Sequence, residues 1–297
     1  RSTVQVARLP KDARIEIENA NVGWTNTIAP EAPVISRPWA IWVAVAAVCA
    51  FIAAEAWIRI RTRDPSYPPV VRSSITITLG SLSDEGEGPV ALSPDGRTLV
   101  FVGGTSGEPP RIWIRPLDSL SAQPLQGTDD ATYPFWSPDG KNIAFFSRGK
   151  LRRIPAAGGT VTQVCDAEDP RGGTWSTNGM IVFAPKPFGP LMRVTAAGGT
   201  PTSITEVANE KWTHRLPYFL PDSERLLYTA GDTTLLKDTC DIMLLDIASR
   251  KSTPLLNERS LGLYAPPGYL IFVRGTNLMA QPFDASKARL TGEAVVL

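Results

Sequence analysis

The sequence predicts an all-β fold, a β-propeller of four-stranded blades, preceded by one transmembrane helix and a short N-terminal helix. Two observations predict the propeller: a turn motif recurs at intervals of 44, 39, 44 and 45 residues, and a β-branched or aromatic run follows each copy. A third observation, a stretch of twenty mostly apolar residues before the first repeat, predicts the membrane helix. We expect about five blades and an incomplete ring.

The repeated turn has a physical basis. Its sequence is Ser-Pro-Asp-Gly in the first two copies and looser in the other three, and the five copies occupy 93–96, 137–140, 176–179, 220–223 and 265–268. Proline presets φ, aspartate bonds the local backbone, and glycine accepts a positive φ. Because Asp95, Asp139 and Asp222 share one turn position, we expect them to cap turns rather than to catalyse or to bind a metal.

Each turn is followed by a run of residues that favour strands, at 99–102, 143–146, 181–183, 226–228 and 270–273. An outer hairpin completes the unit. Residues 153–164 and 193–204 are identical at seven of twelve positions, and each reads as strand, Ala-Ala-Gly-Gly turn and strand. A repeat of 39 to 45 residues that contains two hairpins is typical of a propeller blade.

The ring is predicted to be open. Five turns give about five blades, and residues 294–297 read as part of a strand. Residues 74–79 also read as a strand, which would close a ring by pairing with a final blade. An open ring leaves unpaired edges, which closed propellers avoid.

The apolar stretch 39–58 contains one charge, Glu55, and has the length needed to cross about 30 Å of hydrocarbon. The alternative is a buried core helix, which would rarely be apolar on every face. Three arginines follow the stretch, at 59, 61 and 63, and one precedes it, at 37. The local arginine count would place the C-terminal side in the cytoplasm.

Five strings resemble a known family. They are YPFWSPDG, RGGTW, THRLPYFLPD, YAPPGYLIFVR and LMAQPFD, which begin at 133, 171, 213, 264 and 278. The repeats resemble the WD-like repeats of TolB-type propellers. More narrowly, the strings resemble the propeller half of bacterial membrane-anchored serine/threonine protein kinases. The resemblance implies a cytoplasmic kinase domain upstream of this chain, a single span of the cell inner membrane and a periplasmic propeller.

The resemblance also divides the chain. Residues 12–20 have apolar side chains at helical spacing and are similar to the last helix of the kinase fold. The implied parts are a kinase tail at 1–20, a juxtamembrane linker at 21–38, the transmembrane helix at 39–58, a linker at 59–74 and the propeller at 75–297. On orientation we follow the resemblance, because a folded kinase is harder to translocate than three arginines.

Composition excludes several function classes. The net charge of +1 argues against a nucleic-acid partner. One histidine and three cysteines exclude a two-histidine metal site and a disulfide scaffold. The glycine-rich loop, HRD and DFG motifs of a kinase are absent, so no catalytic site is expected in this chain. No cofactor is expected here either; ATP and magnesium would belong to the kinase domain.

The candidate binding residues on the propeller face are Arg171, His214 and Arg215. They come just ahead of inner strands, where connecting loops reach the face, and each has two readings: a contact with a protein or small-molecule ligand, or a hydrogen bond that locks neighbouring blades. The other partners expected are the membrane and a second copy of the chain in a homodimer. Trp136 and Trp175 are predicted as core aromatics. Cys165 and Cys240 are predicted as unpaired core thiols, with a disulfide left open for an extracytoplasmic propeller.

Two function classes compete. The first is the sensory or interaction propeller of a transmembrane serine/threonine kinase. The second is a membrane-tethered, TolB-like binding propeller without enzymatic activity. A hydrolase with an N-terminal propeller is disfavoured, because no Gly-x-Ser-x-Gly motif is present.

Overall fold

The computed structural model describes residues 38–61, 90–104, 108–232 and 240–297; within 38–61, the side chains of Val43 and residues 45–55 are described. The chain divides into two compact units, 1–71 and 72–297. The predicted helix at 12–20 and the predicted strand at 74–79 lie outside the described residues, as does the predicted linker at 21–38 except for Pro38, which begins the described helix.

The first unit contains one described helix, α1 (Pro38–Arg61), of 24 residues. It covers the stretch predicted to span the membrane. Among the residues that the structure describes, no helix meets the length and apolarity needed to cross a membrane. The span at 39–58 therefore stays a prediction from the sequence.

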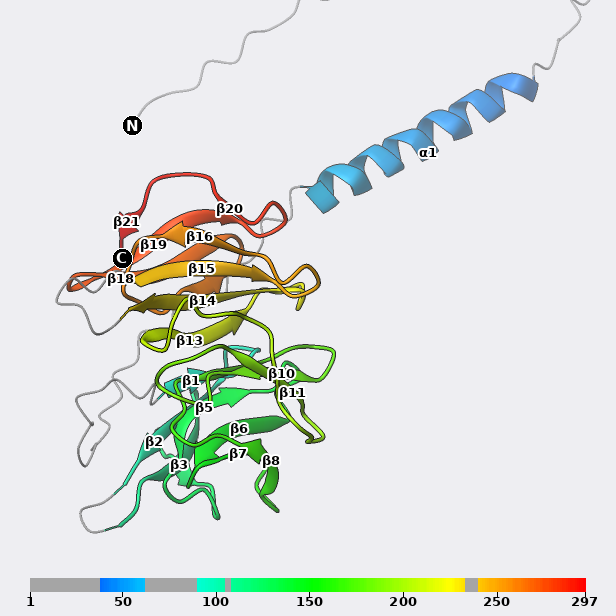
Figure 1. The fold of residues 1–297 in the computed structure, drawn as a ribbon. Coiled ribbons are helices and arrows are strands. Elements are labelled where there is room, and N and C mark those ends of the chain that lie inside the picture. The colour runs from blue at the N-terminus through cyan, green and yellow to red at the C-terminus, as the bar shows by residue number, and fades with distance from the viewer. Residues whose placement is uncertain (1–37, 62–89, 105–107, 233–239) are drawn as a thin grey trace, which may run out of the picture. The chain divides into compact units, whose positions relative to one another are not determined.

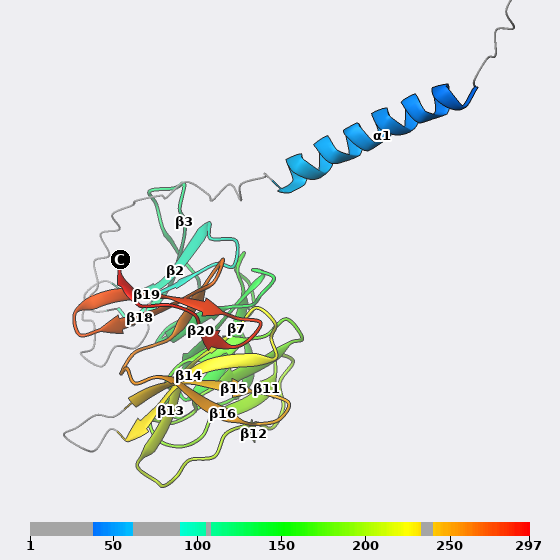
Figure 2. The ribbon, with the colours of Figure 1, turned by 90° about the horizontal axis from the view of Figure 1, so that it is seen from above.

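The second unit is a five-bladed β-propeller, as predicted (Figures 1 and 2). Each blade is an antiparallel sheet whose four strands pair in chain order, and the fifth blade carries one strand more. The first blade consists of β1 (Val90–Leu92), β2 (Thr98–Gly103), β3 (Arg111–Pro116) and β4 (Gln123–Pro124). The second blade consists of β5 (Thr132–Trp136), β6 (Asn142–Ser147), β7 (Lys150–Pro155) and β8 (Thr162–Asp166). The third blade consists of β9 (Gly173–Trp175), β10 (Met180–Phe183), β11 (Met192–Thr195) and β12 (Thr202–Ser203). The fourth blade consists of β13 (Trp212–Phe219), β14 (Arg225–Asp232), β15 (Cys240–Asp246) and β16 (Ser252–Leu256). The fifth blade consists of β17 (Leu263–Ala265), β18 (Tyr269–Arg274), β19 (Asn277–Asp284) and β20 (Arg289–Leu290), together with β21 (Val295–Val296), which pairs with β19.

Along the second strand of a blade, successive side chains point alternately to the two faces of the sheet, and these side chains form the core. In β10, Ile181 and Phe183 pack on the second blade, whereas Val182 packs on the fourth. In β6, Phe146 faces the third blade and Phe145 the first. Because successive side chains of a strand point to opposite faces, one sheet buries both faces between its neighbours. Each of the four consecutive blade pairs thus shares one buried cluster.

The contacts between the fifth and first blades differ from those between blades that follow one another in the chain. Within the described residues, no strand of the fifth blade pairs with a strand of the first, and no buried cluster contains residues of both. Large apolar side chains are exposed on both blades: Val90, Leu92, Tyr269, Val273, Leu278, Val295 and Val296. The strand expected to close the ring lies outside the described residues, so incompleteness stays a prediction.

Candidate functional site

The inner strand of each blade has two ends with different chemistry. We call the end that carries the repeated turn, at 93–96, 137–140, 176–179, 220–223 and 265–268, the turn end. We call the opposite end, which the chain reaches first, the entry end.

The turn end is held by hydrogen bonds that stay within each turn. The hydroxyl of Ser137 donates to Asp139 Oδ1 at 2.6 Å and accepts the amide of Asn142 at 2.9 Å. Ser93 and Asp95 repeat this bond in the first blade. These serine bonds and the adjacent backbone amides lower the pKa of Asp95 and Asp139 below the usual 3.8. The predicted capping role of these carboxylates is confirmed.

A cavity of about 440 Å³ opens at the turn end between the first two blades, and Asp95, Trp136 and Asp139 are among its lining residues. The indole of Trp136 donates to the carbonyl of Ala91 across the blade boundary at 3.2 Å. Within the described residues, no group of three or more His, Cys, Asp or Glu could hold a metal ion.

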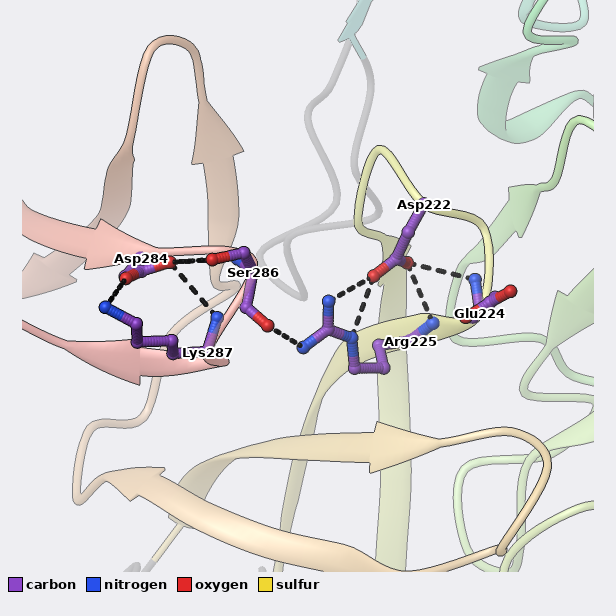
Figure 3. Close-up of polar contacts among 6 residues, drawn as sticks. All are labelled: Asp222, Glu224, Arg225, Asp284, Ser286 and Lys287. Carbon is purple, nitrogen blue, oxygen red and sulfur yellow. Dashed lines mark hydrogen bonds and ion pairs between the residues drawn. The ribbon is translucent and has the colours of Figure 1, made fainter.

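Asp222 also caps its turn, but its contacts reach the next blade. Arg225 pairs with Asp222, and its Nη1 donates to the carbonyl of Ser286 at 3.3 Å (Figure 3). Ser286 belongs to the outer hairpin of the fifth blade, where its hydroxyl donates to Asp284 at 2.6 Å. The turn of the fourth blade therefore holds the fourth and fifth blades together, in addition to reversing the direction of the chain.

The entry end carries a repeated kink. Tyr133, Gly172 and Leu216 each stand four residues before the turn, and all three have a positive φ, of 46°, 92° and 53°. The strand pairing of β5 and β13 shifts register at these points. A positive φ is rare for Tyr and Leu, so this backbone is held by its surroundings.

The kink brings Arg171 and Arg215 to equivalent positions. Each stands five residues before its turn, in the third and fourth blades, and the amide of Leu216 donates to the carbonyl of Arg171 at 2.9 Å. Arg171 pairs with Asp169 at 2.5 Å and has a side chain 18% exposed. Arg215 is half-buried, and its Nε donates to Thr213 Oγ1 at 3.1 Å.

A third arginine joins them, one that the sequence analysis missed. Arg259 is exposed and precedes Ser260, whose carbonyl accepts a hydrogen bond of 2.7 Å from Thr229, the register partner of Arg215. The only signal in the sequence was position, since Arg259 stands six residues before its turn instead of five. Burial is the main cause that lowers the pKa of Arg215; Cys240 opposes this shift most strongly, and the charges of Arg171 and Arg259 add smaller lowering contributions.

The side chain of His214 packs between the third and fourth blades. We expected His214 and Arg215 just ahead of an inner strand, but both lie within β13, because the strand continues through the kink. His214 is 5% exposed, its Nδ1 is 2.8 Å from Thr205 Oγ1 of the third blade, and its ring packs edge-on to Tyr228. Burial lowers its pKa from 6.5 to about 4. The geometry matches the blade-locking reading of this residue.

The remaining predicted core residues behave as expected. Trp136 and Trp175 pack against buried clusters of their blades. Cys165 and Cys240 are buried in different blades, and no disulfide joins them in the described part of the chain. Burial raises the pKa of the Cys165 thiol to about 11, which makes it a poor nucleophile.

Comparison with known proteins identifies the type of propeller. A TolB structure from Acinetobacter baumannii superposes with a TM-score of 0.52 at 14% identity, over 69% of this chain and 55% of that one. A TolB structure from Agrobacterium tumefaciens gives 0.50 at 16% identity, over 57% and 65%. The fold is a TolB-like β-propeller.

The similarity extends to other propellers. A nidogen–laminin complex gives a TM-score of 0.53 at 11% identity, over 68% of this chain and 82% of the matched one. No family model and no curated protein matches the sequence. The chain spans 65% and 55% of the lengths of the two TolB structures. At these identities the comparisons establish the fold alone.

Proposed function

We propose that this propeller is the extracytoplasmic ligand-binding or protein-binding region of a transmembrane serine/threonine protein kinase of the bacterial inner membrane. The observation that carries the proposal is the position of the family-like strings. Four of the five coincide with an inner strand: 133–140 with β5, 171–175 with β9, 213–222 with β13 and 264–274 with β17. All of these except 171–175 also include residues of the turn that follows the strand. The fifth, at 278–284, lies in β19.

In this proposal the kinase domain stands N-terminal to residue 1 and supplies the ATP and magnesium sites. Residues 1–20 are its tail, 39–58 cross the membrane, and the propeller lies in the periplasm. A single helix transmits little by itself, so the signal would pass by formation of a homodimer. The candidate recognition surface is the entry end, because its arginines are not part of the repeated motif that builds the blades.

Reporter fusions to the full-length protein test the topology. Alkaline phosphatase fused after Leu297 should be active, because this enzyme matures outside the cytoplasm. A reporter that works only in the cytoplasm should be silent at the same position. The reverse pattern would place the propeller in the cytoplasm, in line with the arginines at 59, 61 and 63.

A phosphorylation assay tests the kinase assignment. Full-length protein in membranes should transfer phosphate from ATP to serine or threonine when magnesium is present. The second candidate is a membrane-tethered TolB-like binding propeller without enzymatic activity, and the TolB-like fold of the propeller fits it as well. If the coding sequence upstream of Arg1 contains no HRD and DFG pair, the second candidate replaces the first.

A further inference from the structure

We propose that the cavity between the repeated turns of the first and second blades binds an alkylammonium group, that is, a primary amine carried on a short hydrocarbon chain. The proposal goes beyond the function given above, since it assigns a second site, at the turn end, and the chemical class of its ligand. It uses neither the arginines of the entry end nor the kinase and membrane assignments. Failure of those assignments would therefore leave its test unaffected.

The cavity lies between two turns that have the same sequence. Pro94 and Asp95 line it from the first blade, and Pro138 and Asp139 line it from the second, together with Trp136. Its volume of about 440 Å³ falls within the range of small-molecule sites, about 300–1,000 Å³. The space is therefore large enough for a small molecule or for one side chain of a partner protein.

The same place between the third and fourth blades is closed by hydrogen bonds. There, the amide and the hydroxyl of Thr177 both donate to Ser223 Oγ, at 3.1 and 3.0 Å. The equivalent residues in the turns of the first two blades are Pro94 and Gly140. Proline has no N–H and glycine has no side chain, so neither bond can form between these two turns. The cavity is open because two residues differ on a repeated backbone.

Two carboxylates give the cavity a negative charge. Asp95 and Asp139 each accept a serine hydroxyl and a backbone amide on Oδ1, which leaves Oδ2 of each for a ligand. No lysine or arginine is among the described residues that line the cavity. Arg97 and Lys141, which follow the two turns, are exposed and act on the carboxylates less than the serine and amide hydrogen bonds do. The charge of the cavity therefore favours a cation over an anion.

The other walls favour an organic cation. The indole N–H of Trp136 donates to the carbonyl of Ala91, so Trp136 offers a ligand only its ring, and Ile114 and Ala156 add apolar surface. An ammonium group is attracted to the face of an indole, and a hydrocarbon chain gains free energy by leaving water. A calcium ion would instead prefer about six to eight oxygen ligands, which an apolar wall does not supply.

Calorimetry on the purified 297-residue chain in detergent tests the proposal. The first probe is cadaverine, a diamine, and it is compared with the pentanediol of the same length, which has no charge. We expect saturable binding of the amine and none of the diol. Asp95→Asn and Asp139→Asn keep the oxygen that accepts the hydrogen bonds of the turn. Each should weaken binding by about tenfold or more, the effect of losing a charge-assisted hydrogen bond.

Asp118→Asn is the matched control, because Asp118 is exposed in the turn between β3 and β4 of the first blade and does not line the cavity. It removes the same charge and should leave the affinity unchanged. Ala156→Leu fills the cavity without changing its charge and should abolish binding. This variant tests the site independently of the carboxylates, which also take part in folding the turns.

A second probe, acetyl-lysine amide, distinguishes two sources of the ammonium group. Its binding would show that the cavity accepts a lysine side chain of a partner protein, whereas binding of cadaverine alone would assign a free amine. Either result supports the proposal. It would be overturned by the absence of saturable binding of both amines, by equal binding of the diol, or by equal weakening in Asp118→Asn. Unchanged affinity in Ala156→Leu would overturn it as well.

Discussion

The two ends of the inner strands differ in how their sequence relates to their chemistry. At the turn end, the same residue types recur from blade to blade, and their polar groups bond one another within 2.5–3.2 Å. At the entry end, only the kink recurs, and the side chains beside it differ: Thr132, Arg171 and Arg215 occupy equivalent positions. Repetition marks residues that the fold requires in every blade. Residues that vary on a repeated backbone are the ones available for recognition.

The same comparison holds between neighbours on one strand. His214 and Arg215 are adjacent in β13, yet His214 is enclosed between blades and Arg215 keeps two terminal nitrogens without a described partner. Adjacent side chains of a strand point to opposite faces, so neighbours in sequence can have opposite roles. The predictions that follow separate structural from recognition residues at both ends, beginning with the largest expected effect.

Acid should destabilise the propeller through His214. Its pKa is about 4 in the folded protein and 6.5 when unperturbed, so the unfolded chain binds the proton more readily. The contribution of neutral His214 to the free energy of unfolding is fully present above pH 6.5 and is lost as the pH falls toward 4. At 1.36 kcal/mol per pKa unit, this loss is about 3 kcal/mol at most. Thermal unfolding of wild type and His214→Gln between pH 7 and 4.5 measures the effect. Equal pH slopes in the two proteins would show that His214 is not a buried neutral group.

Gly173, at the entry end, is required for close packing of two blades. A Cβ placed there would lie 2.6 Å from Cε1 and 2.8 Å from Cζ of Phe135. We expect Gly173→Ala to cost about 2 kcal/mol of unfolding free energy through overpacking. Gly179→Ala, at the turn end of the same blade, is the control: it has a φ of 80° and open space around it, so it should cost about 1 kcal/mol. Denaturant unfolding compares the two, and an equal or larger loss for Gly179→Ala would contradict the packing argument.

Ser137, at the turn end, should matter for stability. Ser137 is buried, and its hydroxyl donates to Asp139 and accepts the amide of Asn142, so Ser137→Ala removes two hydrogen bonds at a cost of about 1–2 kcal/mol. Ser286→Ala breaks the same type of serine–aspartate bond on an exposed hairpin and should cost under about 0.5 kcal/mol. Denaturant unfolding gives both values. A loss for Ser137→Ala no larger than that for Ser286→Ala would contradict the structural role of the turn serine.

The sequence predicted the turn end far better than the entry end. The five turns, the strands after them and the capping role of Asp139 follow from local residue preferences, which act within a few positions. The kink at Tyr133, Gly172 and Leu216 was not predicted, because only one of these residues is glycine and tertiary contacts impose the positive φ on the other two. Arg171 and Arg215 were singled out by position, whereas their proximity to Arg259 depends on contacts between blades that a single sequence does not reveal.

The smallest predicted effect again concerns acid, now at the turn end. Hydrogen bonds from Ser137 and from a backbone amide hold the pKa of Asp139 below 3.8, so the folded state favours the carboxylate. The stability that this provides is present above about pH 4 and is lost as the pH falls through the lowered pKa. Asp139→Asn keeps the shape of the side chain and cannot ionise, so its melting temperature should fall less steeply between pH 4 and 2.5. Asp166→Asn is the control, because Asp166 is exposed and bonds Lys150 across β7 and β8 instead of a turn backbone. If both variants reduce the fall in melting temperature between pH 4 and 2.5 equally, the turn has no special part in acid sensitivity. The contrast with the entry end is then weaker than proposed.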